Sequence, residues 1–220
     1  MFKSFPFFLA LFLAPVFPSL AQDELPAVYP FAHHGEWGLI DANRQVILEP
    51  SLAYIQLFRA PTEANALTIA TEDGRKGLLR RDGEWAFRPL ADSIGYPQQA
   101  MPQLHWATLD DRYGLVTTAG QPEAWLIHPQ FTEVNDFEGN KISLAVVATA
   151  EGRGVVNQEG EFVAPCIYDE VIIVDRFSDY PNLRLIKDGE VTYLDAHGMP
   201  REPDQEVQAM ASWETAVAAQ

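Results

Sequence analysis

The sequence has one cysteine, Cys166, so it cannot form a disulfide within a single chain. This cysteine lies in an apolar run with no neighbouring histidine, and we interpret it as a small buried hydrophobe. Basic residues are also scarce: 15 lysines and arginines stand against 31 acidic residues, a net charge of −16. Because phosphate backbones and anionic lipids would be repelled, we expect no nucleic acid and no membrane partner. A basic protein partner is electrostatically compatible.

Motifs of common catalytic and metal sites are absent, among them H-E-x-x-H, C-x-x-C, the P-loop and G-x-S-x-G. His33 and His34 with Glu36 come nearest to a metal site. Neighbouring residues on a strand point to opposite faces, so we expect that the two histidines do not ligate one ion. We therefore predict no catalytic, cofactor-binding or metal-binding residue.

Acidic residues gather at predicted hairpin tips, at Glu72-Asp73, Asp110-Asp111 and Asp188. They lack the alternating spacing and the bidentate glutamate of a calcium loop, and we interpret them as solvated turns. One alternative stays open, because carboxylates from distant turns can meet in a fold. A pair of this kind in a cleft would indicate a hydrolase.

The longest apolar run lies at the N-terminus. Lys3 precedes an apolar stretch over 5–17, and small residues then stand before Gln22. This arrangement predicts a secretory signal peptide over 1–21 and a periplasmic or secreted protein, with an uncleaved membrane anchor as the alternative.

A repeated pattern fills most of the remaining chain. Gly-Leu-Ile-Asp at 38–41 recurs in related form at 77–80, 114–117 and 154–157, with glycines 39, 37 and 40 residues apart. Each copy continues into a polar turn and an apolar stretch that ends in proline, and a partial fifth copy spans 184–200. The recurring residues are Gly38, Gly77, Gly114, Gly154, Pro50, Pro89, Pro129 and Pro165. A period near 38 residues indicates a repeat architecture.

Asp-Gly and Glu-Gly turns between β-branched runs indicate hairpins, so each unit is predicted to be a three-stranded antiparallel meander. We predict an all-β fold of five short antiparallel sheets over 28–200 in an open twisted stack, within one domain spanning 22–203. The alternative is closure into a five-bladed propeller. The tail at 204–220 is either a short helix or disordered.

The recurrent glycine stands inside a strand, where glycine is unfavourable without a reason. We expect the adjacent unit to approach its bare face closely. In the fifth copy Thr192 replaces the glycine, as an end unit without a further neighbour would allow.

The segment Trp-Gly-Leu-Ile-Asp at 37–41, together with Pro50 and Tyr54, resembles the WG-repeat family of bacterial proteins. Only this first copy has Trp-Gly; the others read Lys76-Gly77, Tyr113-Gly114 and Arg153-Gly154. The resemblance implies a β-repeat protein and carries over no shared catalytic residue.

Aromatic side chains could line a binding surface or pack between strands, and we favour packing. They are Trp85, Trp106, Trp125, Tyr96, Tyr113 and Phe131. For function we expect an exported, non-enzymatic module of the bacterial envelope that binds a protein or peptide. The alternative is a periplasmic immunity or inhibitor protein that neutralises a basic secreted toxin.

Overall fold

The computed structural model describes residues 26–60, 62–63, 65–98, 101–120 and 125–202. The predicted signal peptide and the predicted tail lie outside these residues. The described part consists of strands joined by turns and loops. The strands are β1 (Val28–His33), β2 (Glu36–Asp41), β3 (Val46–Leu52), β4 (Tyr54–Ile55), β5 (Leu67–Glu72), β6 (Arg75–Arg80), β7 (Trp85–Ala91), β8 (Ser93–Pro97), β9 (Leu104–Leu109), β10 (Arg112–Thr117), β11 (Trp125–Phe131), β12 (Glu133–Val134), β13 (Leu144–Thr149), β14 (Gly152–Asn157), β15 (Phe162–Tyr168), β16 (Glu170–Val174), β17 (Asn182–Lys187) and β18 (Glu190–Leu194).

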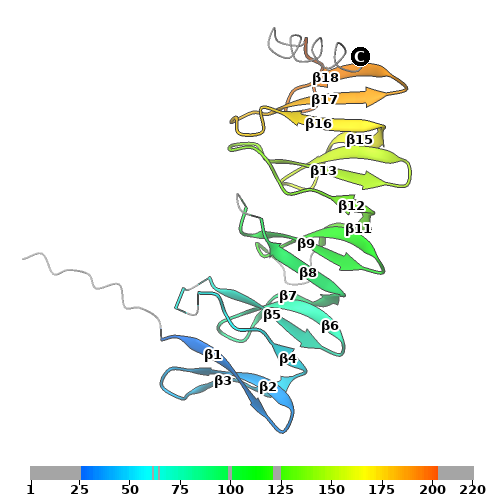
Figure 1. The fold of residues 1–220 in the computed structure, drawn as a ribbon. Helices are drawn as coiled ribbons and strands as arrows, with labels where there is room; N and C mark the ends of the chain where they lie inside the picture. The colour runs from blue at the N-terminus through cyan, green and yellow to red at the C-terminus, as the bar shows by residue number, and fades with distance from the viewer. Residues whose placement is uncertain (1–25, 61, 64, 99–100, 121–124, 203–220) are drawn as a thin grey trace, which may run out of the picture.

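These strands form five antiparallel sheets in chain order: sheet 1 (β1–β3), sheet 2 (β4–β7), sheet 3 (β8–β11), sheet 4 (β12–β15) and sheet 5 (β16–β18). The sheets follow one another along an open stack, with β1 near one end and β18 near the other (Figure 1). The all-β repeat in an open stack is thus confirmed. The five-bladed closure is wrong, because it would bring the strand at 28–31 against the last unit.

Neighbouring sheets are joined by a strand that continues from one into the next. A single residue separates the two parts: Ala53, Asp92, Thr132 or Asp169. Each of these residues donates its backbone N–H to the second strand of the following sheet, as Ala53 does to the Thr71 carbonyl at 2.9 Å. The predicted connectors are therefore strands, and the three middle sheets have four strands where the sequence predicted three.

The turns follow the predicted chemistry. The first hairpin turn of a unit has positive φ at both central residues in His34-Gly35, Asp73-Gly74 and Asp188-Gly189, which is the backbone that suits the twist of a tight hairpin. In the first unit the second turn is capped by Asp41, the residue that ends the Gly-Leu-Ile-Asp pattern. The Asp41 carboxylate accepts the N–H groups of Asn43 and Gln45 at 2.9 and 2.8 Å.

The recurrent glycines lie in β2, β6, β10 and β14, the strand just before the last one in each of the first four sheets. A Cβ on Gly114 would lie 2.7 Å from the Ile127 carbonyl oxygen and 2.8 Å from the Pro129 nitrogen, both in the next strand of the same unit. The expected approach by the adjacent unit is therefore wrong.

The cause is a bulge in the last strand of each of these units, where the pairing register shifts. The bulge contains the recurrent proline, which has no N–H to give to the ladder. The bulged backbone bows toward the middle strand, and only glycine leaves room for it. In the fifth unit Thr192 pairs with Leu185, and the structure describes no later strand up to residue 202 that would crowd it.

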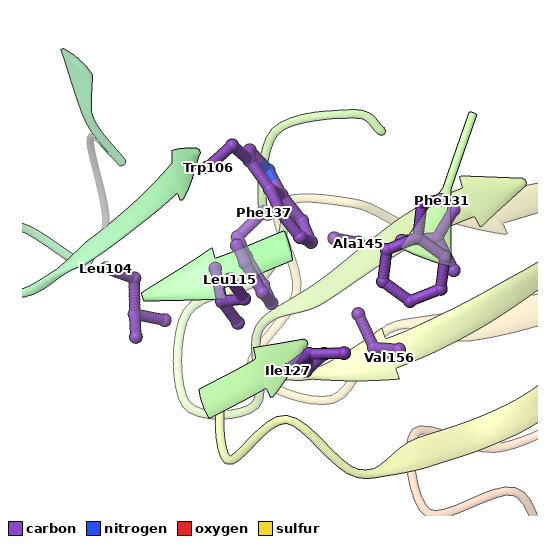
Figure 2. Close-up of a cluster of buried hydrophobic side chains, with 9 residues drawn as sticks. Leu104, Trp106, Leu115, Ile127, Phe131, Phe137, Ala145 and Val156 are labelled. Atoms are coloured by element: carbon purple, nitrogen blue, oxygen red, sulfur yellow. The ribbon is translucent and has the colours of Figure 1, made fainter. Parts of the chain in front are cut away.

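The core lies between sheets, in one apolar cluster at each of the four interfaces. Figure 2 shows the cluster between sheets 3 and 4, where Trp106 of β9 lies against Phe137 from the loop after β12. The two rings stack with centroids 5.6 Å apart. The indole N–H also donates to the Asn135 carbonyl at 3.0 Å, so the buried nitrogen is satisfied.

Candidate functional site

The loop after the first strand of a unit carries a phenylalanine that closes the interface with the preceding sheet. Tyr54, Ser93 and Glu133 hold equivalent positions in sheets 2, 3 and 4, because each pairs with the same position of the second strand of its sheet. Four residues after this position the chain has Phe58 in sheet 2 and Phe137 in sheet 4. Both are 7% exposed and belong to the clusters with sheets 1 and 3, respectively. These two rings pack into the first and third interfaces.

At the interface between sheets 2 and 3 the same position is Pro97. Here the structure has a hollow of about 440 Å³, and Pro97 lines it. A pyrrolidine ring is smaller than a phenyl ring and is held against its own backbone, so it does not reach across the interface as the two phenylalanines do. The apolar part of the lining is Leu57, Ala60, Ala66, Leu67, Ile69, Leu78, Tyr96, Pro97 and Pro102.

The polar group of most interest in this hollow is His105. It lies in β9, where residues alternate between the two sides of the sheet. Trp106 packs toward sheet 4, and Ala107, on the same side of β9 as His105, packs toward sheet 2. The imidazole therefore lies at the interface that forms the hollow, and only 3% of the residue is exposed.

One nitrogen of this imidazole is bonded and the other is not. Nδ1 lies 3.1 Å from the Gly95 carbonyl oxygen, which can only accept, so Nδ1 carries the proton. Nε2 is buried without a hydrogen-bond partner, and in this tautomer it presents a lone pair. Burial lowers the pKa of His105, and the bond to Gly95 partly opposes that change. The neutral ring thus lies in the wall of the hollow, with its unused acceptor Nε2 out of contact with solvent.

Tyr96 and Arg59 also line the hollow. The guanidinium carbon of Arg59 lies 4.0 Å from the centre of the Tyr96 ring, a cation–π distance. Tyr96 is nevertheless 67% exposed, so its ring remains largely in solvent. Glu63 is the only carboxylate among the described lining residues.

The model of the WG containing repeat matches residues 154–179, from Gly154 in β14 through β15 and β16. The chain contains a segment similar to the WG containing repeat. No curated protein and no solved structure matches it significantly. The matched segment is shorter than one period of the array described above, and it contains the glycine, the bulge and the connecting strand in order.

The other residues singled out from the sequence are dispersed along the array. His33 and His34 have ring centroids 4.0 Å apart, so the expectation that they point to opposite faces is wrong. The reason is that His34 lies in the turn, with a φ of 53°. Within the described ranges no three histidine, cysteine or acidic side chains come together as a metal site would need. The acidic residues Asp73, Asp110, Asp111 and Asp188 occupy hairpin turns.

The aromatic residues divide between two roles. Trp106 and Phe131 are buried, and Trp85 and Trp125 pack against core clusters, whereas Tyr96 and Tyr113 are exposed by 67% and 36%. Packing thus accounts for four of the six.

Cys166 is partly buried and packs against the cluster between sheets 3 and 4. Burial raises the pKa of its thiol, which disfavours the nucleophilic thiolate.

Sequence reasoning missed the site around His105, which it treated as one of several scattered histidines. The signal was available in the alignment of the units, where Phe58, Pro97 and Phe137 occupy one position.

In the part of the chain that the structure describes, no helix is long and apolar enough to cross a bilayer.

Proposed function

We propose that this protein is an exported, non-enzymatic module of the bacterial envelope that binds a segment of another protein. The observation that supports this proposal is the hollow between sheets 2 and 3. It combines an apolar wall with a buried imidazole nitrogen that has no partner. Binding sites in proteins commonly have this composition, with apolar lining and a few polar groups that orient the ligand.

The chemistry of the hollow favours binding over hydrolysis. A hydrolase that uses two carboxylates needs both acids in one cleft, about 5–10 Å apart. Glu63 is the single carboxylate among the described lining residues. The array around the hollow also suits an extended partner, because neighbouring sheets present their loops side by side along the stack (Figure 1).

A second candidate function rests on charge alone. The net charge of −16 favours association with a basic protein, which is the property expected of an immunity or inhibitor protein acting on a basic secreted toxin. The two candidates differ in their response to salt. Attraction between net charges is screened at raised ionic strength, whereas apolar burial in the hollow is not.

Affinity capture from envelope extract, with residues 22–220 as bait, tests the proposal. We expect one enriched protein that stays bound when the salt concentration is raised. A partner lost on raising salt would favour the second candidate. Activity on an envelope polymer that disappears when one pair of acids is replaced, with no partner captured, would overturn the binding function.

A further inference from the structure

The array shows what kind of group its sheet interfaces accept. At two of them the chain's own phenylalanine, Phe58 or Phe137, enters from the loop after the first strand and is 7% exposed. At the interface of sheets 2 and 3 the aligned residue is Pro97, and a hollow of about 440 Å³ takes the place of the ring. The walls that hold an aromatic ring elsewhere are present here without it.

The hollow differs from the filled interfaces in one polar feature. The position of His105 in β9, opposite Val116, is occupied by Thr68 in sheet 2 and by Ala145 in sheet 4. The Nε2 atom of His105 is buried and unpartnered. A buried acceptor without a donor is unfavourable, and it is relieved by a ligand donor that reaches the nitrogen.

The neighbouring interface shows the arrangement that would satisfy such an acceptor. There the Trp106 indole stacks on Phe137 and donates its N–H to the Asn135 carbonyl at 3.0 Å. Tyrosine and tryptophan are the two side chains that combine a large ring with a hydrogen-bond donor. Phenylalanine has the ring without the donor, and serine has the donor without the ring.

We infer that the hollow between sheets 2 and 3 receives a tyrosine or tryptophan side chain of a partner protein, whose O–H or N–H donates to Nε2 of His105. The inference rests on the proposed binding function and specifies its ligand. The net charge of −16 adds a preference for basic residues on either side of that side chain.

The experiment uses residues 22–220 and four capped pentapeptides. Each has two lysines on both sides of a central tryptophan, tyrosine, phenylalanine or alanine. Calorimetric titration at neutral pH and low salt gives the affinity of each. We expect the tryptophan and tyrosine peptides to bind about threefold to tenfold more tightly than the phenylalanine peptide, since one neutral hydrogen bond distinguishes them. The alanine peptide should bind most weakly.

Two variants place the binding in the hollow. Pro97→Phe gives sheet 3 the ring that sheets 2 and 4 already have, and should abolish binding of all three aromatic peptides while leaving the urea unfolding midpoint equal or higher. His105→Phe keeps an aromatic ring and removes the acceptor, so the tryptophan, tyrosine and phenylalanine peptides should then bind equally. The matched control is Phe177→Ser, which removes an 80% exposed aromatic ring after β16 and should change nothing.

Each outcome has a defined meaning. Binding that survives Pro97→Phe in a folded variant would place the ligand elsewhere and overturn the inference, while the proposed binding function would stand. Equal affinities of the wild-type protein for the tryptophan and phenylalanine peptides would overturn the role of His105. Failure of all four peptides to bind would also overturn the inference, and the capture experiment would still decide the binding function separately.

Discussion

Gly114→Val tests the account of the recurrent glycine most directly. A Cβ at this position would lie 2.7 Å from the Ile127 carbonyl oxygen, 2.8 Å from the Pro129 nitrogen and 2.8 Å from Cε3 of Trp125. Ordinary Cβ contacts begin at 3.4 Å, so β11 must retreat by about 0.6–0.7 Å even for alanine. Two of the three atoms belong to backbone, which cannot move aside by changing a rotamer.

The expected loss of stability follows from that crowding. Overpacking by a single carbon costs about 1–3 kcal/mol, which is the range for Gly114→Ala. Valine adds two γ-carbons at the same place and should cost about 2–4 kcal/mol. Urea unfolding followed by circular dichroism measures the change, and with an m-value of about 2 kcal/mol/M the midpoint should fall by roughly 1–2 M for valine.

The control for this prediction is Gly95→Ala in β8. Gly95 is also a strand glycine, but its Cβ would meet only one atom within 4 Å, the Trp106 carbonyl oxygen at 3.2 Å. We expect its midpoint to change by less than half as much as that of Gly114→Ala. Equal shifts for the two alanine variants would refute the argument that the bulged strand requires the glycine.

Three further predictions concern other parts of the chain. Phe137→Ala should destabilise the protein by about 3–5 kcal/mol in urea unfolding, because it empties the interface at Trp106; a loss under about 1 kcal/mol would contradict the role given to this ring. Burial lowers the pKa of His105, so the unfolded state binds the extra proton. Stability should therefore be lost as pH falls below about 6.5, by at most about 1.4 kcal/mol per pH unit, and His105→Phe should flatten that dependence; identical pH profiles would count against it. N-terminal sequencing of protein from the envelope fraction should begin at Gln22, and a retained Met1 would show that the signal peptide is not cleaved.

Much of the fold could be predicted because its rules are local. The Gly-Leu-Ile-Asp pattern, its period and the Asp-Gly turns indicated the hairpins, since a tight turn depends on the φ preferences of two adjacent residues. Asp41 could likewise be recognised as a turn residue, because a carboxylate caps N–H groups only two and four residues away. These interactions do not depend on which sheet lies next to the turn.

The partner of Gly114 could not be predicted in the same way. Sequence shows that something must approach a strand glycine, but the register shift that brings the Pro129 segment against it arises only when β10 and β11 pair. The hollow is a similar case. The sequence places Pro97 eight residues after Pro89, as Phe58 and Phe137 follow Pro50 and Pro129. Only the packing of sheet 2 on sheet 3 shows that a hollow remains there and that His105 lines it.

The sequence by itself therefore determined the strands, the turns and the repeat, because each of these is encoded within a span of about one unit. Tertiary structure alone decided that the array stays open, that the glycine faces its own unit, and that a hollow lined by Pro97 and His105 lies between sheets 2 and 3. All three depend on how successive sheets rotate and pack on one another. That packing is the sum of many side-chain contacts between units, and no short stretch of sequence contains it.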